Sequence, residues 1–332
     1  MKPNLSTSYL GLVLKNPFMA GASPLGHDIS HIRRLEDAGS AAIVLPSLFE
    51  EQIALEKKAR ENHIEAHTEG FAEATTYLPT VDDFDKSVDE YLRLIQDAKQ
   101  AVDVPVIASL NGITPGGWIA HAKLLEEAGA GAIELNYYDL PSDPDETGVE
   151  VEKRAISMVR AVRNEVTIPI AVKLSPFFSS LPNFAKQLVA AGANGLVLFN
   201  RFYQPDIDIE ELDVTPALEL SSPSELRLRL RWLAILSSRL DTSYAATGGV
   251  HSAPDAVRAI MAGATVVQLV SCLLRFGPEH LRLIIEEFNE WLAEHEYDSV
   301  KQLRGAMNLK HSPDPTGFER ANYLRILQGW RV

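Results

Sequence analysis

Cysteine is almost absent from this sequence, and its one representative, Cys272, has no partner for a disulfide within the chain. A single thiol also excludes a cysteine-ligated cluster or a thiolate zinc site built by this chain alone. No apolar run approaches the roughly 20 residues that a membrane-spanning helix needs, and residues 1–4 lack the apolar core of a signal peptide. We therefore expect a cytoplasmic protein that does not enter a membrane.

Positive charge is in deficit, because 31 Lys and Arg residues stand against 45 Asp and Glu residues and leave a net charge of −14. The resulting field opposes polyanions, so we expect neither nucleic acid nor an anionic membrane surface as a partner. A local basic pocket for one small anion is compatible with this balance. The histidines show no metal-ligand spacing, and we expect no metal site.

Four segments repeat one pattern, in which the end of a helix is followed by a glycine and then by a short apolar run. Glycine adopts the left-handed conformation that closes a helix at no side-chain cost. The apolar run is typical of a strand buried on both faces of a parallel sheet. The segments are residues 36–45, 126–135, 189–198 and 260–269, with their glycines at Gly39, Gly129, Gly192 and Gly263.

Each repeat is preceded by a further apolar strand, which gives four β-α-β units and eight strands. The preceding strands are residues 17–20, 104–110, 168–174 and 243–249. A doubly wound sheet also alternates strands and helices, but the even repetition favours a closed barrel. We predict one α/β domain over residues 1–332, a single (β/α)8 TIM barrel with a C-terminal helical segment from about residue 276. Two long irregular stretches, 50–83 and 202–222, are expected to be lids or binding loops.

The residues at the carboxyl ends of the eight strands share a chemical character. In a TIM barrel these positions form the functional site. Here they are uncharged hydrogen-bonding groups, one lysine and two adjacent glycines, which suit a planar heteroaromatic ligand that carries a phosphate. The candidate cofactor-binding residues are Gly21, Ala22, Ser47, Ser109, Asn136, Lys173, Asn200, Gly248, Gly249, Val270 and Ser271.

The strongest signal for a phosphate is Thr-Gly-Gly-Val-His-Ser at residues 247–252. Two glycines let backbone N–H groups approach an anion, and the helix that follows, with Ser252 as its expected N-cap, adds partial positive charge. Val270 and Ser271, at the end of the next strand, would supply the other side of a phosphate cup. The competing interpretation is a strand-helix turn that needs glycine only for its geometry.

Lys173 lies within an otherwise apolar strand. An unpaired ammonium is expensive to bury, so its side chain is expected to face the polar mouth of the barrel. Three roles are open there: stabilising negative charge on a reduced flavin, forming a Schiff base with a substrate, or pairing with Glu134 on a nearby strand. Asn136, two residues after Glu134, is either a loop-capping amide or a ligand contact.

Several motifs resemble the dihydroorotate dehydrogenase family of class 1, in the family's order and over nearly the whole chain. They are Leu-Gly-Leu-Val-Leu-Lys-Asn-Pro-Phe-Met-Ala-Gly-Ala-Ser at 10–23, Ile-Glu-Leu-Asn at 133–136, Val-Lys-Leu-Ser-Pro at 172–176, Thr-Gly-Gly-Val-His-Ser at 247–252 and Val-Gln-Leu-Val-Ser at 267–271. The resemblance implies an FMN-binding barrel in pyrimidine metabolism. It assigns the FMN phosphate to Gly248, Gly249 and Ser271, the isoalloxazine ring to Gly21, Ala22 and Ser47, and the contacts beside flavin and substrate to Asn136, Lys173 and Asn200.

The substrate side departs from the family pattern. Asp139 stands where the family has a cysteine or serine as general base, and Pro141 replaces an asparagine that binds orotate. Pro46 stands in place of a lysine, and Ala74 in place of another asparagine. A site that lacks the groups that hydrogen-bond to a polar ring cannot discriminate strongly in favour of that ring over other substrates. The resemblance therefore implies FMN binding more firmly than it implies dihydroorotate oxidation.

The leading hypothesis is an FMN-dependent oxidoreductase that acts on a CH–CH bond of a small substrate, with Lys173 and Asp139 as catalytic residues. One alternative is a flavin-free barrel lyase that uses Lys173 as a Schiff base. Another is a flavin-binding subunit that relays electrons or regulates a partner without a substrate of its own. We also expect a redox protein as a partner and a homo-oligomeric assembly.

Overall fold

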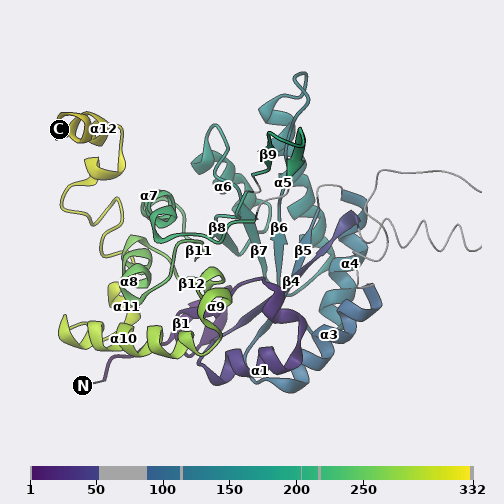
Figure 1. Cartoon of the computed structure of the whole chain (residues 1–332), viewed down its shortest axis with the longest axis horizontal. Coiled ribbons are helices and arrows are strands. Elements are labelled where there is room, and N and C mark those ends of the chain that lie inside the picture. The colour runs from purple at the N-terminus through teal and green to yellow at the C-terminus, as the bar shows by residue number, and fades with distance from the viewer. Residues whose placement is uncertain (1, 52–87, 113–114, 203, 216–217, 330–332) are drawn as a thin grey trace, which may run out of the picture.

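Eight parallel strands form a closed barrel in the order β11-β12-β3-β4-β5-β6-β7-β8, which confirms the predicted (β/α)8 fold. Figure 1 shows these strands at the centre of the molecule with helices around them. The strands are β3 (Phe18–Ala20), β4 (Ile43–Phe49), β5 (Val106–Asn111), β6 (Ala132–Asn136), β7 (Ile170–Leu174), β8 (Gly195–Leu198), β11 (Ser243–Thr247) and β12 (Val266–Leu269). The computed structural model describes residues 2–51, 88–112, 115–202, 204–215 and 218–329.

One helix or more follows each barrel strand and covers its outer face. Between successive strands lie α1 (Ile29–Asp37), α3 (Val88–Ala101), α4 (Pro115–Glu127), α5 (Gly148–Glu165), α6 (Leu181–Ala190), α7 (Leu226–Ser237) and α8 (Ala253–Ala262). After β12 the chain continues through α9 (Ser271–Phe276), α10 (His280–Glu294), α11 (Val300–Leu303) and α12 (Ala321–Gly329). Among the helices of the described ranges, none is long and apolar enough to cross a membrane.

The repeated glycines perform the function that the sequence pattern predicts. All four have positive φ, between 102° and 121°, and Gly263 is the C-cap of α8. The second strands of the four units, β4, β6, β8 and β12, begin a few residues after these glycines and are buried almost throughout. The local pattern of helix end, glycine and apolar run thus marks four of the eight strands directly.

The helix α10 packs against the barrel through one apolar face. Its buried residues are Leu281, Ile284, Phe288 and Leu292, which recur at intervals of three or four. The Phe288 ring meets that of Phe18 in β3 edge to face, with centroids 5.1 Å apart. This contact joins the C-terminal helices to the first strand of the barrel.

A short antiparallel hairpin, β1 (Thr7–Tyr9) and β2 (Leu12–Leu14), closes the amino-terminal end of the barrel. Tyr9 packs in one buried cluster with residues from every barrel strand, including Ala132 of β6 and Val266 of β12. Burial, and then the Glu134 carboxylate, raise the pKa of Tyr9 well above its ordinary value. Its hydroxyl is buried without a hydrogen-bond partner among the described residues.

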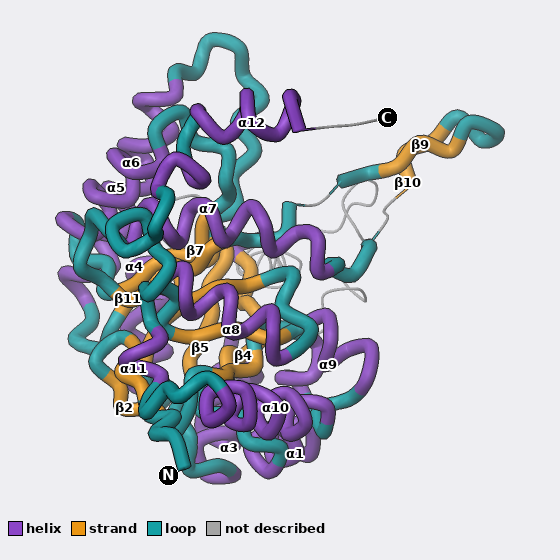
Figure 2. The backbone as a smooth tube through the Cα atoms, turned by 90° about the vertical axis from the view of Figure 1, so that its left-hand side faces the viewer, coloured by secondary structure: helices purple, strands orange, loops and turns teal. Residues whose placement is uncertain are grey.

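A second hairpin lies within residues 202–222, where the sequence suggests irregular structure. It consists of β9 (Asp206–Asp208) and β10 (Asp213–Thr215), paired antiparallel. Acidic and apolar residues alternate over 206–209 with the two-residue period of a strand, which accounts for the pairing. Figure 2 shows this hairpin projecting away from the barrel. Its apolar side chains are between 62% and 87% exposed: Ile207, Ile209, Leu212 and Val214.

Candidate active site at the barrel mouth

Three predicted site residues meet at the carboxyl-terminal mouth of the barrel: Asn136 of β6, Lys173 of β7 and Asn200, which follows β8. Asn136 and Lys173 are partners in the β6–β7 register. The Asn200 side chain donates to Asn136 Oδ1 at 2.8 Å, and its backbone N–H donates to the Leu174 carbonyl at 2.7 Å. These bonds hold the ends of three neighbouring strands together.

A buried polar network lies beside these strand ends. Glu134 is 1% exposed, and its Oε1 lies 3.3 Å from Lys173 Nζ. Its Oε2 accepts a hydrogen bond from Gln268 Nε2 at 2.7 Å. The other amide atom, Gln268 Oε1, is buried with no partner in the part of the chain that the structure describes. The ion pair anticipated as one role of Lys173 is therefore present, and it neutralises a carboxylate that would be costly to bury alone.

The two glycines that follow β11 have φ values of +84° at Gly248 and +83° at Gly249. A Cβ at Gly249 would lie 2.4 Å from the Leu226 nitrogen, and a Cβ at Gly248 would lie 2.7 Å from Arg229 Nη2. Both contacts come from α7, which approaches this turn closely. Backbone geometry and helix packing thus require both glycines whether or not an anion binds, so the glycines alone do not distinguish the two interpretations.

A cluster of hydrogen-bonding groups lies next to this turn. Ser221 Oγ accepts from the Gly249 N–H at 3.2 Å, donates to Ser271 Oγ at 2.9 Å and lies 3.4 Å from His251 Nε2. Ser271 Oγ in turn accepts from the Ser221 N–H at 3.0 Å. Two hydroxyls, two backbone N–H groups and an imidazole therefore converge at the ends of β11 and β12. Three of these donors, the two N–H groups and the Ser221 hydroxyl, bond within the cluster, so they would have to exchange those bonds to donate to a phosphate oxygen.

Ser221 is a site residue that the sequence reasoning missed. It precedes the short helix η3 (Pro223–Glu225) and stands 50 positions before Ser271 in the chain. The available signal was local: two consecutive serines before a proline, followed by a capping box between Ser222 and Glu225. Such a signal marks a helix start, but it does not reveal that the preceding loop returns to the barrel mouth.

Ser252 is the N-cap residue of α8, as predicted, but its side chain makes no capping bond to the helix. Its hydroxyl donates instead to Asp255 Oδ2 at 2.8 Å. The same carboxylate oxygen accepts from the His251 N–H at 3.2 Å. Asp255 therefore fixes the segment that carries His251 to the first turn of α8.

A cavity of about 130 Å³ adjoins the cluster, and its wall carries more positive than negative charge. The cationic side chains are Lys173, Arg201 and Arg229, and the carboxylate among the described lining residues is Glu225. Burial lowers the pKa of Arg229, whose Nε donates to the Thr247 carbonyl at 2.9 Å. A small anion can therefore find a favourable local field here in spite of the net negative charge of the chain.

The remaining cofactor candidates come from β3, β4, β5 and β12. Ser47 and Ser109 are hydrogen-bonded through their hydroxyls at 2.8 Å. Ser109 is fully buried, so it supports Ser47 and does not itself line the mouth. The β4–β5 register shifts between Val44 and Ser47, where Pro46 interrupts the ladder.

Gly21 follows β3, and its N–H extends the ladder with β12 by donating to the Leu269 carbonyl at 3.0 Å. A Cβ at this position would lie 2.7 Å from Val270 Cγ2. The absence of a side chain at Gly21 therefore makes room for Val270. Ala22 and Val270 both line the 130 Å³ cavity.

Asp139, the predicted general base, is held in an ion pair. Its Oδ2 accepts from Arg154 Nη2 at 2.6 Å and from the Tyr137 hydroxyl at 2.8 Å. Arg154 also pairs with Glu146. Burial, and then Asp139, raise the pKa of Tyr137, which keeps its hydroxyl a donor. Asp139 therefore anchors the loop after β6 to α5, and its described contacts connect it to neither Lys173 nor Asn136.

The other departures on the substrate side fall in different places. Pro46 lies within β4, and Pro141 lies in the loop between β6 and α5. Pro141 and Asp139 both line a cavity of about 480 Å³. Ala74 and most of the stretch 50–83 lie outside the described residues.

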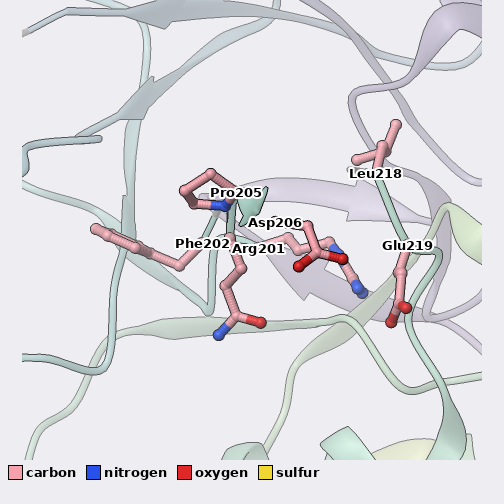
Figure 3. A pocket seen from close by; sticks show the side chains of 7 residues that line it. Arg201, Phe202, Pro205, Asp206, Leu218 and Glu219 are labelled. Atoms are coloured by element: carbon pink, nitrogen blue, oxygen red, sulfur yellow. The ribbon is translucent and has the colours of Figure 1, made fainter. Parts of the chain in front are cut away.

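A third cavity, of about 280 Å³, lies between the end of β8 and the base of the β9–β10 hairpin (Figure 3). Phe202 lines both this cavity and the one of 480 Å³. Arg201 pairs with Glu225 at 3.1 Å, and in Figure 3 its side chain extends toward the side where Asp206 and Glu219 lie. Arg201 thus pairs with one carboxylate, Glu225, and shares this cavity with two others.

Comparison with known proteins identifies the family. The family model for dihydroorotate dehydrogenase matches residues 84–292, which is more than half of the chain. The chain belongs to the dihydroorotate dehydrogenase family. Together with the relatives, this match shows a dihydroorotate dehydrogenase-like oxidoreductase, as the motifs indicated.

The relatives cover nearly the whole barrel. A protein of Aeropyrum pernix, provisionally named dihydroorotate dehydrogenase A (fumarate), is 29% identical over 314 residues, spanning 92% of this chain and 97% of its own. The catalytic subunit of dihydroorotate dehydrogenase B (NAD(+)) from Thermoplasma acidophilum is 26% identical over 316 residues, spanning 91% and 98%. The NAD-dependent dihydropyrimidine dehydrogenase subunit PreA of Escherichia coli is 23% identical over 326 residues, spanning 92% and 77%.

A double-mutant cycle tests the coupling between Glu134 and Lys173. Lys173→Met leaves a buried carboxylate without its cation and is expected to lower the free energy of unfolding by roughly 3 kcal/mol. The double variant Glu134→Gln/Lys173→Met should lose less than the sum of the single losses, because no unpaired charge remains. Urea denaturation at pH 7 gives the free energy of unfolding of wild type, Glu134→Gln, Lys173→Met and the double variant.

Arg34→Met is the matched control, since it removes an ion pair to Glu279 in which both side chains are about half exposed. It should cost at most about 1 kcal/mol. Strictly additive losses at positions 134 and 173 would show that the two side chains are not energetically coupled.

Proposed function

We propose that this chain binds FMN at the carboxyl-terminal mouth of the barrel and uses it to oxidise or reduce a CH–CH bond of a small substrate. The observation that carries this proposal is the convergence of Ser221, Ser271, His251 and the Gly249 N–H beside the ammonium of Lys173. Membership in the dihydroorotate dehydrogenase family supports the same reaction class.

The groups at the mouth fit the hydrogen-bonding capacity of FMN. A phosphate needs several donors, and the serine cluster offers them without a carboxylate in direct contact. Among the described residues Gln268 Oε1 is a buried acceptor without a donor, and Gln268 lines the same cavity as Lys173. A flavin ring presents both an N–H group and carbonyl oxygens, so it could satisfy an orphaned acceptor and an ammonium together.

In this proposal the phosphate is held by Gly248, Gly249 and Ser271, with Ser221 added by the structure. The ring lies against Gly21, Ala22, Ser47 and Val270, and Ser109 supports Ser47. Asn136, Lys173 and Asn200 contact the ring or the substrate beside it. Bound FMN supplies a ring that takes up two electrons from the substrate.

Lys173 has the positioning that such a reaction requires. The Glu134 contact at 3.3 Å and the β6–β7 register fix its ammonium at the strand end, so little reorganisation is needed when negative charge develops beside it. The same contact disfavours the lyase hypothesis. A Schiff base forms when the amine nitrogen attacks a carbonyl carbon, whereas this nitrogen is already engaged by the Glu134 carboxylate at 3.3 Å.

The proposed role of Asp139 as the group that moves the substrate proton is subject to a condition. Its Oδ2 already accepts hydrogen bonds from Arg154 and Tyr137. To act as a base, the carboxylate must exchange one of these partners for the substrate or use its second oxygen. The location of Asp139 on the wall of the 480 Å³ cavity is what supports the role.

A protein partner for electron transfer is part of the proposal. Two of the relatives are named as subunits, which supports a separate redox protein as electron acceptor or donor. The exposed apolar residues of the β9–β10 hairpin support self-association as well, because large exposed apolar patches commonly mark contact surfaces.

Substitution at Ser271 tests the phosphate site without the packing problem that any side chain at Gly249 would create. Ser271→Asp places a carboxylate at the cup and should weaken FMN binding by roughly a hundredfold, because like charges brought together cost several kcal/mol. Ser271→Ala, the neutral control, should lose about fivefold, the value of one hydrogen bond. Fluorescence titration with FMN gives both affinities.

Riboflavin, which lacks the phosphate, should bind wild type and Ser271→Asp equally. Thermal unfolding of the two apoproteins should also coincide. Full FMN occupancy in a folded Ser271→Asp protein would exclude this position for the phosphate.

The pH dependence of FMN binding tests His251. Burial, and then Arg275, lower the pKa of this imidazole in the ligand-free protein, while Asp255 and Glu225 oppose the shift. A neighbouring phosphate favours the protonated ring, so FMN binding takes up a proton and the contribution of His251 declines as pH rises. The FMN affinity of wild type relative to His251→Asn should be highest near pH 5.5 and approach equality above about pH 8.

Because both proteins bind the same ligand, the titration of the phosphate itself cancels in this ratio. Titration of both proteins with FMN at several pH values gives the ratio of their affinities. Riboflavin is the control ligand, for which this ratio should not change with pH. Parallel pH profiles for FMN would mean that His251 does not contact the phosphate.

Dihydroorotate is expected to be a poor substrate or none. Pro46, Pro141 and Ala74 cannot donate side-chain hydrogen bonds, although the family resemblance places a lysine and two asparagines there. The Asp139 carboxylate also repels the carboxylate of this substrate. Anaerobic mixing of the FMN-loaded protein with dihydroorotate should leave the flavin absorbance unchanged, whereas dithionite should bleach it. Steady-state oxidation at about 10 per second, typical of enzymes, would contradict this expectation.

A further inference from the structure

The largest of the three cavities at the barrel mouth, about 480 Å³, lies directly beyond the strand ends that would flank the flavin. Tyr137 follows Asn136, Ser175 follows Lys173 by two residues, and Phe202 follows Asn200 by two. All three of these following residues line the cavity. A molecule in it would therefore lie next to the strand ends that carry Asn136, Lys173 and Asn200.

The cavity wall is predominantly apolar and aromatic. The rings of Phe177 and Phe202, both in the wall, meet edge to face with centroids 5.1 Å apart. The ring of Tyr138 stacks on that of Phe202, with centroids 4.8 Å apart. Phe178 and Val151 also contribute apolar surface to the wall. The Tyr137 hydroxyl is directed to Asp139 and the Val151 carbonyl, so its ring contributes apolar surface. Such a wall favours a ring-shaped, largely apolar ligand, and the volume lies in the range of sites for small organic molecules.

The charges on this wall have one sign. Asp139, Glu146 and Glu152 line the cavity, and no lysine or arginine does so among the described residues. Arg154 neutralises part of this charge by pairing with Asp139 and Glu146. Glu152 has no ion-pair partner within the described ranges. An anionic ligand would therefore enter against uncompensated negative charge.

We propose that this cavity receives the substrate and that the substrate is an apolar, ring-bearing molecule without negative charge. This assignment of a substrate class rests on the proposed FMN-dependent function. It differs from a compact, polar, anionic pyrimidine, which needs many hydrogen-bond donors and no repelling charge, whereas the described wall sets the hydroxyls of Ser175 and Ser179 beside three carboxylates.

A charge series on one ring tests the proposal. Benzoate, benzamide and benzamidinium share a ring and differ in charge, being negative, neutral and positive. Isothermal titration calorimetry on the FMN-loaded protein should show binding of benzamide and benzamidinium, with benzoate at least about tenfold weaker than benzamide. Glu152→Gln should reduce the ratio of the benzamide affinity to the benzoate affinity by about fivefold, which corresponds to the loss of one partly exposed charge interaction.

Two glycine substitutions locate the binding. Gly148 lines the cavity, and a Cβ there meets no atom within 4 Å, so Gly148→Trp adds a ring to the wall and should abolish benzamide binding. Gly317 also has open space around its Cβ but does not line this cavity. Gly317→Trp should therefore leave benzamide binding unchanged.

The outcomes separate this inference from the function on which it rests. Benzoate binding as tight as benzamide, binding of none of the three probes, or benzamide binding that survives Gly148→Trp would each overturn the assigned substrate class. The visible spectrum of the same samples reports FMN. A protein that cannot be loaded with FMN would overturn the proposed function itself, whatever the order of the probes.

Discussion

Glu134 places a carboxylate inside the barrel, and the arrangement of the mouth depends on how that charge is compensated. Its two partners come from different strands, Lys173 from β7 and Gln268 from β12. Any slip of either strand would leave a buried carboxylate unpaired, at a cost of several kcal/mol. The network therefore fixes the relative heights of β6, β7 and β12, and with them the positions of Asn136 and Ser271. Its influence also reaches the opposite end of the barrel, where burial, and then the same carboxylate, raise the pKa of Tyr9.

The fold was predictable because its rules are local. A glycine with positive φ after a helix, followed by a buried run, marks a strand of a parallel barrel, as at Gly263 before β12. Once eight strands are recognised, the barrel topology brings their carboxyl ends together. Asn136, Lys173 and Asn200 could therefore be grouped from the sequence, although no short motif contains all three.

The rest of the site could not be predicted because it depends on where loops return and on which partners side chains choose. Ser221 reaches the turn at Gly249 from a loop whose path the sequence does not specify. The same limit applies to Asp139, whose pairing with Arg154 of α5 is invisible in a motif comparison. At Gly249 the sequence suggested room for a ligand, and the structure shows that Leu226 occupies the space a side chain would need.

The mouth of the barrel combines two unlike environments within a few residues. Around β11 the wall is polar and carries Lys173 and Arg229, whereas beyond β6 and β7 it is aromatic and carries Glu152. Arg201 and Phe202, adjacent in the chain, lie on either side of this division. One short segment after β8 thus separates a region suited to an anion from a region suited to an uncharged ring.

The closure of the barrel has a consequence for how the chain is made. Strand β3 pairs with β12 through Phe18 and Val267, so the first barrel strand must wait for the last to leave the ribosome. Until then β3 offers an unpaired edge rich in apolar side chains, the kind of surface that associates wrongly with other chains. The β1–β2 hairpin and the start of β3 are synthesised early but gain a stable place late. The barrel of a nascent chain therefore cannot close before β12 has been made, and its open edge is exposed to other chains until then.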